Sequence, residues 1–332
     1  MTTKIAFFNN KGGVGKTTLV YHLAYMFAER GIPVLAVDLD PQCNLSAMFL
    51  PEERLEAIWN SQGTLLSAIQ PLVQRTGDIA PTEPEAILPN LHLLVGDLGL
   101  SRYEDLLAEN WGKCLNGEAG AFRVMSAFHR IIEEAARKRG IGLALIDLGP
   151  NLGPLNRAAL LAADRIVLPI APDLFSLQGL ENFGPKLVEW RKGWVKRVEE
   201  YHESGPSEQD GLSLPDGRME PIGYVLMSFG VRDNRPVKAY DHWTRKIPST
   251  YRTAVLQEPI VGSIPEPDPQ RLAALKHYRS LMPMAMTARK PMFLLQSADG
   301  ARGSHLDAVK KCYRDFLNLA EEIGRRIGLA VS

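Results

Sequence analysis

The stretch Asn9-Asn10-Lys11-Gly12-Gly13-Val14-Gly15-Lys16-Thr17-Thr18 decides the fold of this chain. It follows an apolar run, residues 5–8, and precedes residues 17–30, whose apolar side chains have helical spacing. A buried strand, a glycine loop and a helix start, in this order, form the setting of a phosphate-binding loop. Glycines let backbone N–H groups surround an anion, and the helix start adds partial positive charge. The pattern predicts Lys16 at the β and γ phosphates of a nucleotide and Thr17 on Mg²⁺.

The loop departs from the common pattern G-x-x-x-x-G-K-[ST], because Asn10 stands where the first glycine is expected. A second lysine, Lys11, heads the loop instead. A glycine turn that only joins a strand to a helix would not explain two lysines and two threonines. The loop resembles the deviant Walker A motif of the ParA/MinD family of dimerising ATPases. The resemblance implies that ATP is bound by Lys11, Gly12, Gly13, Val14, Gly15, Lys16, Thr17 and Thr18.

A second apolar run, residues 34–37, is typical of a strand buried on both faces, and it ends in Asp38-Leu39-Asp40-Pro41-Gln42-Cys43-Asn44. Ligands of open α/β sheets lie beyond the carboxyl ends of the strands, so the two acids favour function over a capped turn. The segment D-x-D-P-Q-x-N resembles the ParA branch in particular. That resemblance assigns Asp38 to the water shell of Mg²⁺ and Asp40 to orienting the attacking water. The candidate catalytic residues are therefore Lys11, Lys16 and Asp40.

A third apolar run, residues 143–146, leads into Asp147. This is the form of a Walker B strand, whose acid would hold Mg²⁺ through water. Gly149 and Asn151 stand where ParA relatives commonly have proline and serine. The predicted metal set is Thr17, Asp38 and Asp147, with both acids acting through water.

Strands and helices alternate along the chain, which predicts an α/β fold with a doubly wound, mainly parallel sheet and helices on both faces, a P-loop NTPase. We expect about seven strands, the last at 260–265, a loop at 77–89 and a helix at 270–281. The chain is interpreted as one domain, 1–332, with insertions near 50–120 and 203–220 and a helical tail at 285–332.

Composition excludes several classes of protein. Lys+Arg and Asp+Glu both number 38 in 332 residues, so a globally basic nucleic-acid binder is excluded, although a local basic face is not. The three cysteines form no CxxC pair, which argues against a zinc ribbon or a disulfide scaffold. No apolar run reaches ~18 residues, so no membrane-spanning helix is expected. With no signal peptide recognisable, we expect a cytoplasmic protein, with association to the nucleoid as one option.

Lys11 carries a further implication of the resemblance. In the family, the extra lysine crosses into the partner subunit and contacts its ATP, so two chains enclose two ATP molecules. Positive charge supplied in trans stabilises the phosphates only when the dimer forms. The resemblance therefore implies a homodimer that ATP assembles and hydrolysis releases.

ParA-like dimers bind DNA without sequence preference and position a cargo together with a partner that stimulates hydrolysis. The resemblance implies a ParB-like or operon-encoded partner here. No helix-turn-helix precedes the loop, so operator binding is not expected. Candidates for contact with DNA phosphates are Arg232, Arg235, Lys238, Arg245 and Lys246, and a second cluster is Arg191, Lys192, Lys196 and Arg197. Each cluster taken alone fits a solvated helix face equally well.

Two other functions stay open at this point. A ParA-fold ATPase can serve as a regulatory or scaffold subunit of a mobile-element or defence operon without partitioning DNA. A MinD-like membrane switch needs a terminal amphipathic anchor, and residues 324–332 offer too short an apolar surface. Specificity for adenine rests on the resemblance alone, with Ser228, Phe229 and Pro265 on loops suited to framing the base.

Overall fold

The computed structural model describes residues 2–205, 211–228, 237–276, 278 and 280–331, with the backbone alone for Ser228 and residues 237–241. Within these residues eight strands form one sheet, in the order β3-β4-β2-β5-β1-β6-β7-β8. The strands are β1 (Thr3–Phe7), β2 (Val34–Asp38), β3 (Glu85–Leu88), β4 (Leu91–Leu94), β5 (Leu143–Asp147), β6 (Arg165–Ile170), β7 (Glu220–Ser228) and β8 (Arg271–Lys276).

The sheet is mainly parallel, as predicted. Every neighbouring pair is parallel except β3 and β4, which run antiparallel at one edge. After β1 the chain builds one half of the sheet, returns through β5 beside β1, and then builds the other half through β6, β7 and β8. The carboxyl end of β1, where the glycine loop begins, therefore lies near the middle of the sheet, where ligands of such folds bind.

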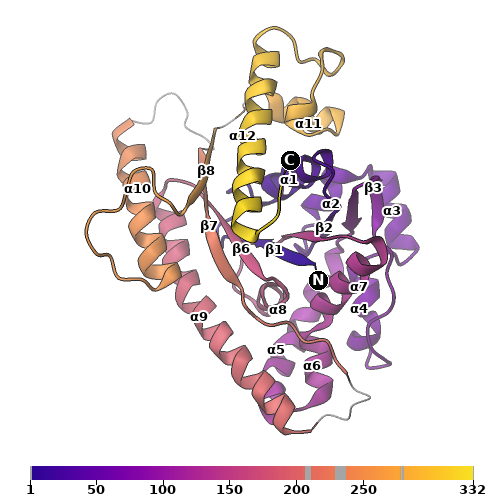
Figure 1. Cartoon of the computed structure of the whole chain (residues 1–332). Coiled ribbons are helices and arrows are strands. Elements are labelled where there is room, and N and C mark those ends of the chain that lie inside the picture. The colour runs from indigo at the N-terminus through magenta and orange to yellow at the C-terminus, as the bar shows by residue number, and fades with distance from the viewer. Residues whose placement is uncertain (1, 206–210, 229–236, 277, 279, 332) are drawn as a thin grey trace.

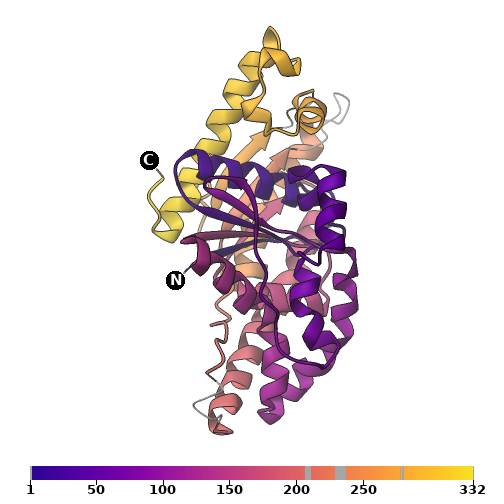
Figure 2. The same ribbon diagram turned by 90° about the vertical axis from the view of Figure 1, so that its right-hand side faces the viewer.

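Helices cover both faces of the sheet (Figure 2). On one face lie α1 (Lys16–Glu29), α2 (Asn44–Phe49), α3 (Glu52–Asn60), α11 (Leu281–Ala288) and α12 (Ser304–Ile327). On the other lie α4 (Leu65–Val73), α5 (Glu104–Lys113), α6 (Ala119–Met125), α7 (Ala127–Arg139), α8 (Pro154–Ala162), α9 (Leu174–Glu203) and α10 (Val237–Thr250). Side chains along and just after β1 point alternately to the two faces of the sheet. Ile5 and Phe7 pack in the hydrophobic core under α1 and α12, and Ala6 and Phe8 pack in the core of the opposite face.

The described residues form eight strands where about seven were expected, and three segment assignments were wrong. β3 lies inside the segment predicted as a loop, and residues 260–265 contain no strand, with Val261 89% exposed. Within the segment predicted as a helix, 270–281, lies instead the edge strand β8, Arg271–Lys276. Leu272 and Leu275 stand three residues apart, which imitates helical spacing, but β8 pairs in parallel with β7. An edge strand is partly exposed, so its sequence lacks the unbroken apolar run of a central strand.

Two parts of the molecule project beyond the sheet (Figure 1). At one end α9, 30 residues long, runs beside α5 and α6. At the opposite end α11 stands beside the start of α12, and residues 289–303 connect the two helices. None of the described helices has the length and apolar character needed to cross a membrane.

Candidate nucleotide-binding site

The glycine loop connects β1 directly to α1. Gly13 and Gly15 have φ values of 73° and 90°, in the left-handed region that glycine adopts without strain. Gly15 occupies the position before the first residue of α1, which is Lys16. The first N–H groups of a helix have no partner within the helix, and its dipole favours negative charge there. The loop therefore has the geometry of an anion site.

Lys16 is almost completely buried under this loop. Its Nζ donates to the backbone oxygens of Asn9, at 3.2 Å, and of Lys11, at 3.3 Å. Burial lowers the pKa of the Lys16 ammonium, and the carboxylates of Asp147 and Asp40 oppose that shift. An ammonium held inside a glycine loop is well placed to pair with a phosphate, which would supply the missing counter-charge.

Two buried carboxylates lie on neighbouring strands at the same edge of the sheet. Asp38 ends β2 and Asp147 ends β5, and the two are partners in the register of these strands. Among the residues that the structure describes, none has the hydrogen-bond geometry to pair with either oxygen of Asp147 or with Oδ1 of Asp38. Burial raises the pKa of Asp38 to about 7, and burial together with the charge of Asp38 raises the pKa of Asp147 well above its ordinary value. Such uncompensated oxygens fit a magnesium ion bound through water.

Ser46 and Gly96 fix the position of Asp38. Oδ2 of Asp38 accepts hydrogen bonds from the backbone N–H of Ser46, at 2.8 Å, and from its hydroxyl, at 2.7 Å. The Ser46 hydroxyl accepts in turn from the N–H of Gly96, at 3.0 Å. A Cβ on Gly96 would lie 2.9 Å from Cγ of Asp38, so only glycine fits beside this carboxylate. Sequence reasoning missed both residues, although Ser46 follows Asp38 on the next helix.

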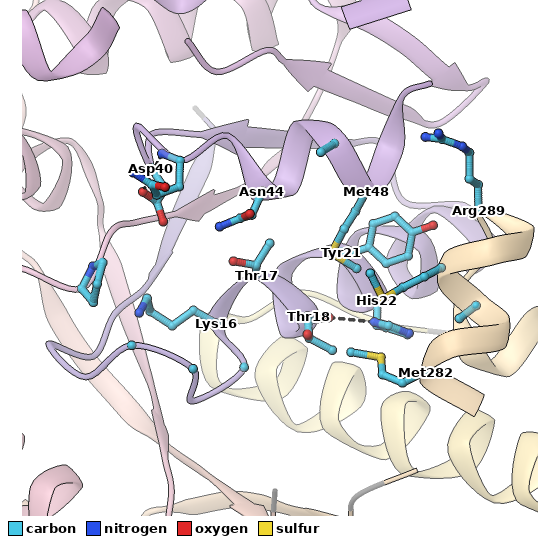
Figure 3. Close-up of a pocket in the computed structure, with 18 of the residues that line it drawn as sticks. Lys16, Thr17, Thr18, Tyr21, His22, Asp40, Asn44, Met48, Met282 and Arg289 are labelled. Atoms are coloured by element: carbon cyan, nitrogen blue, oxygen red, sulfur yellow. Dashed lines mark hydrogen bonds between the residues drawn. The ribbon is translucent and has the colours of Figure 1, made fainter. Parts of the chain in front are cut away.

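Asp40 lies beside the loop as well. Its Oδ1 accepts a hydrogen bond from the N–H of Gln42 at 3.0 Å, which orients the carboxylate. Gly149, just after β5, allows a close approach, because a Cβ there would lie 3.3 Å from this oxygen. Asp40, Lys16 and Thr17 all line one cavity (Figure 3).

Lys11 has a different environment from Lys16. Its Nζ forms an ion pair with Asp173, whose other carboxylate oxygen accepts from the N–H of Ser176 at 2.9 Å and so caps the start of α9. Lys11 is half-buried and does not line the cavity that contains Lys16. The two lysines of the loop are thus separated: one side chain lies inside the site, while the other lies against α9.

The cavity has a volume of about 830 Å³ and extends from the loop to α11 (Figure 3). Of the residues predicted to frame the base, Pro265 is exposed and does not line this cavity. Ser228 ends β7, and Phe229 lies outside the described residues. The end of the cavity farthest from the loop is instead formed by α11 and the residues after it: Met282, Ala285, Met286, Arg289 and Lys290. The methionine-rich run at 282–286 was the available sequence signal.

The predicted DNA contacts are described only in part. Arg245 and Lys246 are exposed on α10, and the Lys246 ammonium lies 5.1 Å from the centre of the Trp243 ring. For Lys238 only the backbone is described, and Arg232 and Arg235 lie outside the described residues. In the second cluster, Arg197 is a wrong assignment: it is 7% exposed. It donates to the backbone oxygens of Trp111 and Gly193, at 2.7 and 2.8 Å, and lies over the Trp111 ring.

The sequence of this chain is similar to one family model and to several known proteins. Residues 2–198 match the family model described as an AAA domain. A replication protein of Rhizobium rhizogenes is 33% identical over 241 residues, which cover 68% of this chain and 54% of that protein. The chromosome-partitioning ATPase Soj of Thermus thermophilus is 31% identical over 195 residues, 59% of this chain and 65% of Soj. The matches thus span about half to two thirds of the length of these curated relatives.

A solved structure resembles the chain over nearly its whole length. The crystal structure of a Corynebacterium diphtheriae protein superposes with a TM-score of 0.73 at 23% identity, covering 98% of this chain and 99% of that one. At this level of identity the likeness shows the fold alone. The positions of the loop, the acids and the cavity are observed in this chain itself.

Proposed function

The chain belongs to the AAA domain family matched by residues 2–198, within its ParA-type P-loop ATPases, and from this premise we propose that it is a nucleotide-switched partition ATPase. It binds Mg-ATP, forms a dimer that encloses two ATP molecules, and hydrolyses ATP slowly to release that dimer. In the ATP-bound dimer it binds DNA without sequence preference, and with a partner protein that stimulates hydrolysis it positions a plasmid, a chromosome or another cargo.

One observation carries the nucleotide-binding part of this proposal. A buried ammonium, Lys16, and two buried carboxylates, Asp38 and Asp147, meet at the carboxyl edge of the sheet beside a glycine loop. Within the described part of the chain, three oxygens of these acids lack a hydrogen-bond partner, and the acceptors of the Lys16 ammonium are two loop carbonyls. Burying such groups costs free energy that a bound phosphate and its metal ion would offset.

Each residue takes a role from its position. Thr17, Asp38 and Asp147 would hold Mg²⁺, the acids through water, and the ion would neutralise charge on the phosphates. Lys16 pairs with the β and γ phosphates. Asp40, lining the same cavity and oriented by the N–H of Gln42, holds the attacking water.

Lys11 supports the dimer in this proposal. Its side chain lies outside the chain's own cavity, near the surface at the start of α9, where a second protomer can approach. Exposed Leu174 and Phe175, 43% and 67% exposed, follow Asp173 at this place and offer apolar area to bury. When the dimer forms, Lys11 leaves Asp173 and contacts the phosphates of the opposite ATP.

The variant Lys11→Ala tests the proposal. We expect it to bind ATP with affinity within about threefold of the unaltered protein, because Lys16 remains, and to stay monomeric with ATP and Mg²⁺. Calorimetry measures the binding and light scattering measures the mass. Lys186→Ala, a change of the same charge on the exposed face of α9, is the control and should dimerise normally. ATP-driven dimerisation of Lys11→Ala equal to that of the control would reject the enclosed-ATP dimer.

A further inference from the structure

The segment that follows β5 borders the phosphate end of the cavity. It consists of residues 148–153, between β5 and α8. Pro150 lines the cavity, and a Cβ on Gly12 of the glycine loop would lie 4.0 Å from Cγ of its ring. Gly149 lies against Asp40, where a Cβ would come within 3.3 Å of Oδ1. The segment therefore lies beside both the glycine loop and the acid that orients the attacking water in the proposed function.

The residue types in this segment do not fix its conformation. Residues 148–153, all of them described, form neither a helix nor a strand. Gly149 and Asn151 stand where ParA relatives commonly have proline and serine. Proline fixes φ, whereas glycine has more conformational freedom than any other residue. A segment of this composition needs contacts from elsewhere in the chain to stay in place.

Asn156, in the first turn of α8, supplies those contacts. Its Nδ2 donates to the backbone oxygen of Gly149, at 2.9 Å, and to that of Asn151, at 2.7 Å. These two carbonyls stand immediately before and after Pro150, so the amide holds the chain on both sides of the proline. The side-chain Oδ1 of Asn151 lies 3.1 Å from the same Nδ2 and also accepts from the N–H of Gly153, at 2.8 Å. The two hydrogens of one amide are thus shared among three acceptors of the segment.

These hydrogen bonds come at a cost, because Asn156 is completely buried. Its Oδ1 has no hydrogen-bond partner among the described residues. An unpaired amide oxygen inside a protein costs free energy, and an apolar residue of the same shape would avoid that cost. Its neighbours in α8, Leu155 and Ala158, are apolar and buried. The donors of Asn156 are therefore what distinguishes it from a leucine at this position.

We propose that Asn156 is a positioning residue for ATP hydrolysis, which holds residues 149–150 so that Asp40 keeps its place beside the glycine loop. Asn156 does not line the cavity, so it acts through the segment rather than on the nucleotide itself. The proposal rests on the proposed function, since it assumes that Asp40 orients the attacking water. It predicts an effect on the rate of hydrolysis and none on the affinity for ATP, because the residues that bind the phosphates stay in place.

The variant Asn156→Leu tests the proposal, because leucine has nearly the same size and no donor. We expect its kcat for hydrolysis of Mg-ATP to fall by about tenfold to 100-fold, the usual effect of a small displacement near reacting groups. Its dissociation constant for a nonhydrolysable ATP analogue should stay within about threefold of that of the unaltered protein. Release of phosphate measures the first quantity, and calorimetry measures the second. A kcat within about threefold of the unaltered protein, or above it, overturns the proposal.

The variant Asn110→Leu is the matched control. Asn110 on α5 is also buried, and its Nδ2 also donates to a backbone oxygen, that of Leu106, at 2.8 Å. It does not line the cavity. The control loses the same chemical group, so it should lose stability in thermal unfolding and keep its kcat. A fall in kcat equal to that of Asn156→Leu would mean that the loss of any buried amide slows hydrolysis, and this result overturns the proposal.

A mimic of the transition state separates positioning from a general loss of structure. Mg-ADP with aluminium fluoride imitates the phosphoryl group in transfer, whereas the nonhydrolysable analogue imitates the ground state. A positioning residue stabilises the transition state more than the ground state. Asn156→Leu should therefore bind the aluminium fluoride complex about tenfold more weakly, or weaker still, and bind the analogue as before. Equal weakening of both ligands means that the site as a whole has lost its structure, and this outcome overturns the proposal.

Two further variants complete the test. Asn156→Ala removes the same donors and favours a helix, so it replaces Asn156→Leu if that variant does not fold, with the same expectations. Lys16→Ala should lose binding of both ligands. If it binds them as the unaltered protein does, or if the unaltered protein does not hydrolyse Mg-ATP, the proposed function fails and this inference fails with it. If Lys16→Ala loses binding while a folded Asn156 variant keeps its kcat, only the role of Asn156 fails.

Discussion

His22 illustrates how one buried side chain links the site to the stability of the molecule. Its Nδ1–H donates to the backbone oxygen of Thr18 at 2.7 Å, and its Nε2 accepts from the N–H of Met292 at 3.1 Å. The ring stacks on Phe316 with centroids 4.8 Å apart. This geometry requires a neutral imidazole with the proton on Nδ1. Burial lowers the pKa of His22 from 6.5 to about 4.

The lowered pKa predicts a loss of stability in mild acid. Between pH 6.5 and 4 the unfolded chain binds a proton at His22 and the folded chain does not, so stability falls as the pH falls through this window. From pH 7.5 to 5.0 this residue should remove about 2 kcal/mol from the free energy of unfolding. The difference in the free energy of unfolding between the unaltered protein and His22→Gln should therefore decrease by about 2 kcal/mol over the same pH range.

Urea denaturation without nucleotide at both pH values measures this effect. His129, whose pKa burial also lowers to about 4, contributes equally to both proteins and cancels from the comparison. His202→Gln, on the exposed end of α9, is the control and should show no such convergence. A stability difference between His22→Gln and the unaltered protein that is the same at pH 7.5 and 5.0 contradicts the assignment of a neutral His22.

At the scale of elements, the position of α9 depends on one close contact with the backbone of a neighbouring turn. Its Gly184 packs against the π-helical turn Tyr251–Leu256, and a Cβ on this glycine would lie 1.8 Å from the backbone oxygen of Ala254. Real Cβ atoms do not come so close to backbone, so either the helix or the turn would have to move. The turn follows α10, and α9 begins directly after Asp173, which pairs with Lys11, so this contact positions both helices.

Gly184→Ala should destabilise the protein by about 1–3 kcal/mol or more, the usual cost of overpacking a well-packed contact. Gly112→Ala makes the same chemical change within α5, where nothing lies within 4 Å of the new Cβ. That control should be stabilising by roughly 0.5–1 kcal/mol, because alanine is the better helix former. Thermal unfolding of the two variants measures both effects, and equal melting temperatures would contradict the close contact.

The elements that could be predicted from the sequence are those that a local motif or an apolar run defines. The glycine loop, the strand ending in Asp38 and the strand ending in Asp147 all follow from short-range signals, since buried parallel strands read as apolar runs and the loop has a motif. α11 and β8 could not be predicted in this way. β8 is an edge strand with helix-like spacing, and the importance of α11 arises only from long-range contacts to Leu50 and His22. The Lys11–Asp173 pair is likewise visible only after folding.

At the scale of the whole molecule, the sheet assembles the site from distant parts of the chain. Lys16, Asp38 and Asp147 meet because β1, β2 and β5 are neighbours in the sheet. The chain carries equal numbers of acidic and basic residues, so a polyanion such as DNA would need a local excess of positive charge. α10 presents two exposed cations, Arg245 and Lys246, and a dimer would present them twice.

If Arg245 and Lys246 of both protomers contact DNA, the affinity for DNA should depend on salt concentration in a predictable way. Each lysine or arginine contact to a phosphate releases counterions and contributes about 0.9 to the slope of log affinity against log salt concentration. The double variant Arg245→Ala, Lys246→Ala should therefore lower the magnitude of the slope by up to about 3.6 per dimer, and weaken binding to any sequence alike. Fluorescence anisotropy with random duplex DNA, a nonhydrolysable ATP analogue and 50–200 mM salt measures this slope.

The control is the double variant Lys310→Ala, Lys311→Ala, which removes the same charge from exposed positions of α12 and should leave the slope unchanged. Equal slopes for the two double variants would place the DNA surface elsewhere, and an unaltered protein that binds no DNA with the analogue would remove DNA from the proposed function.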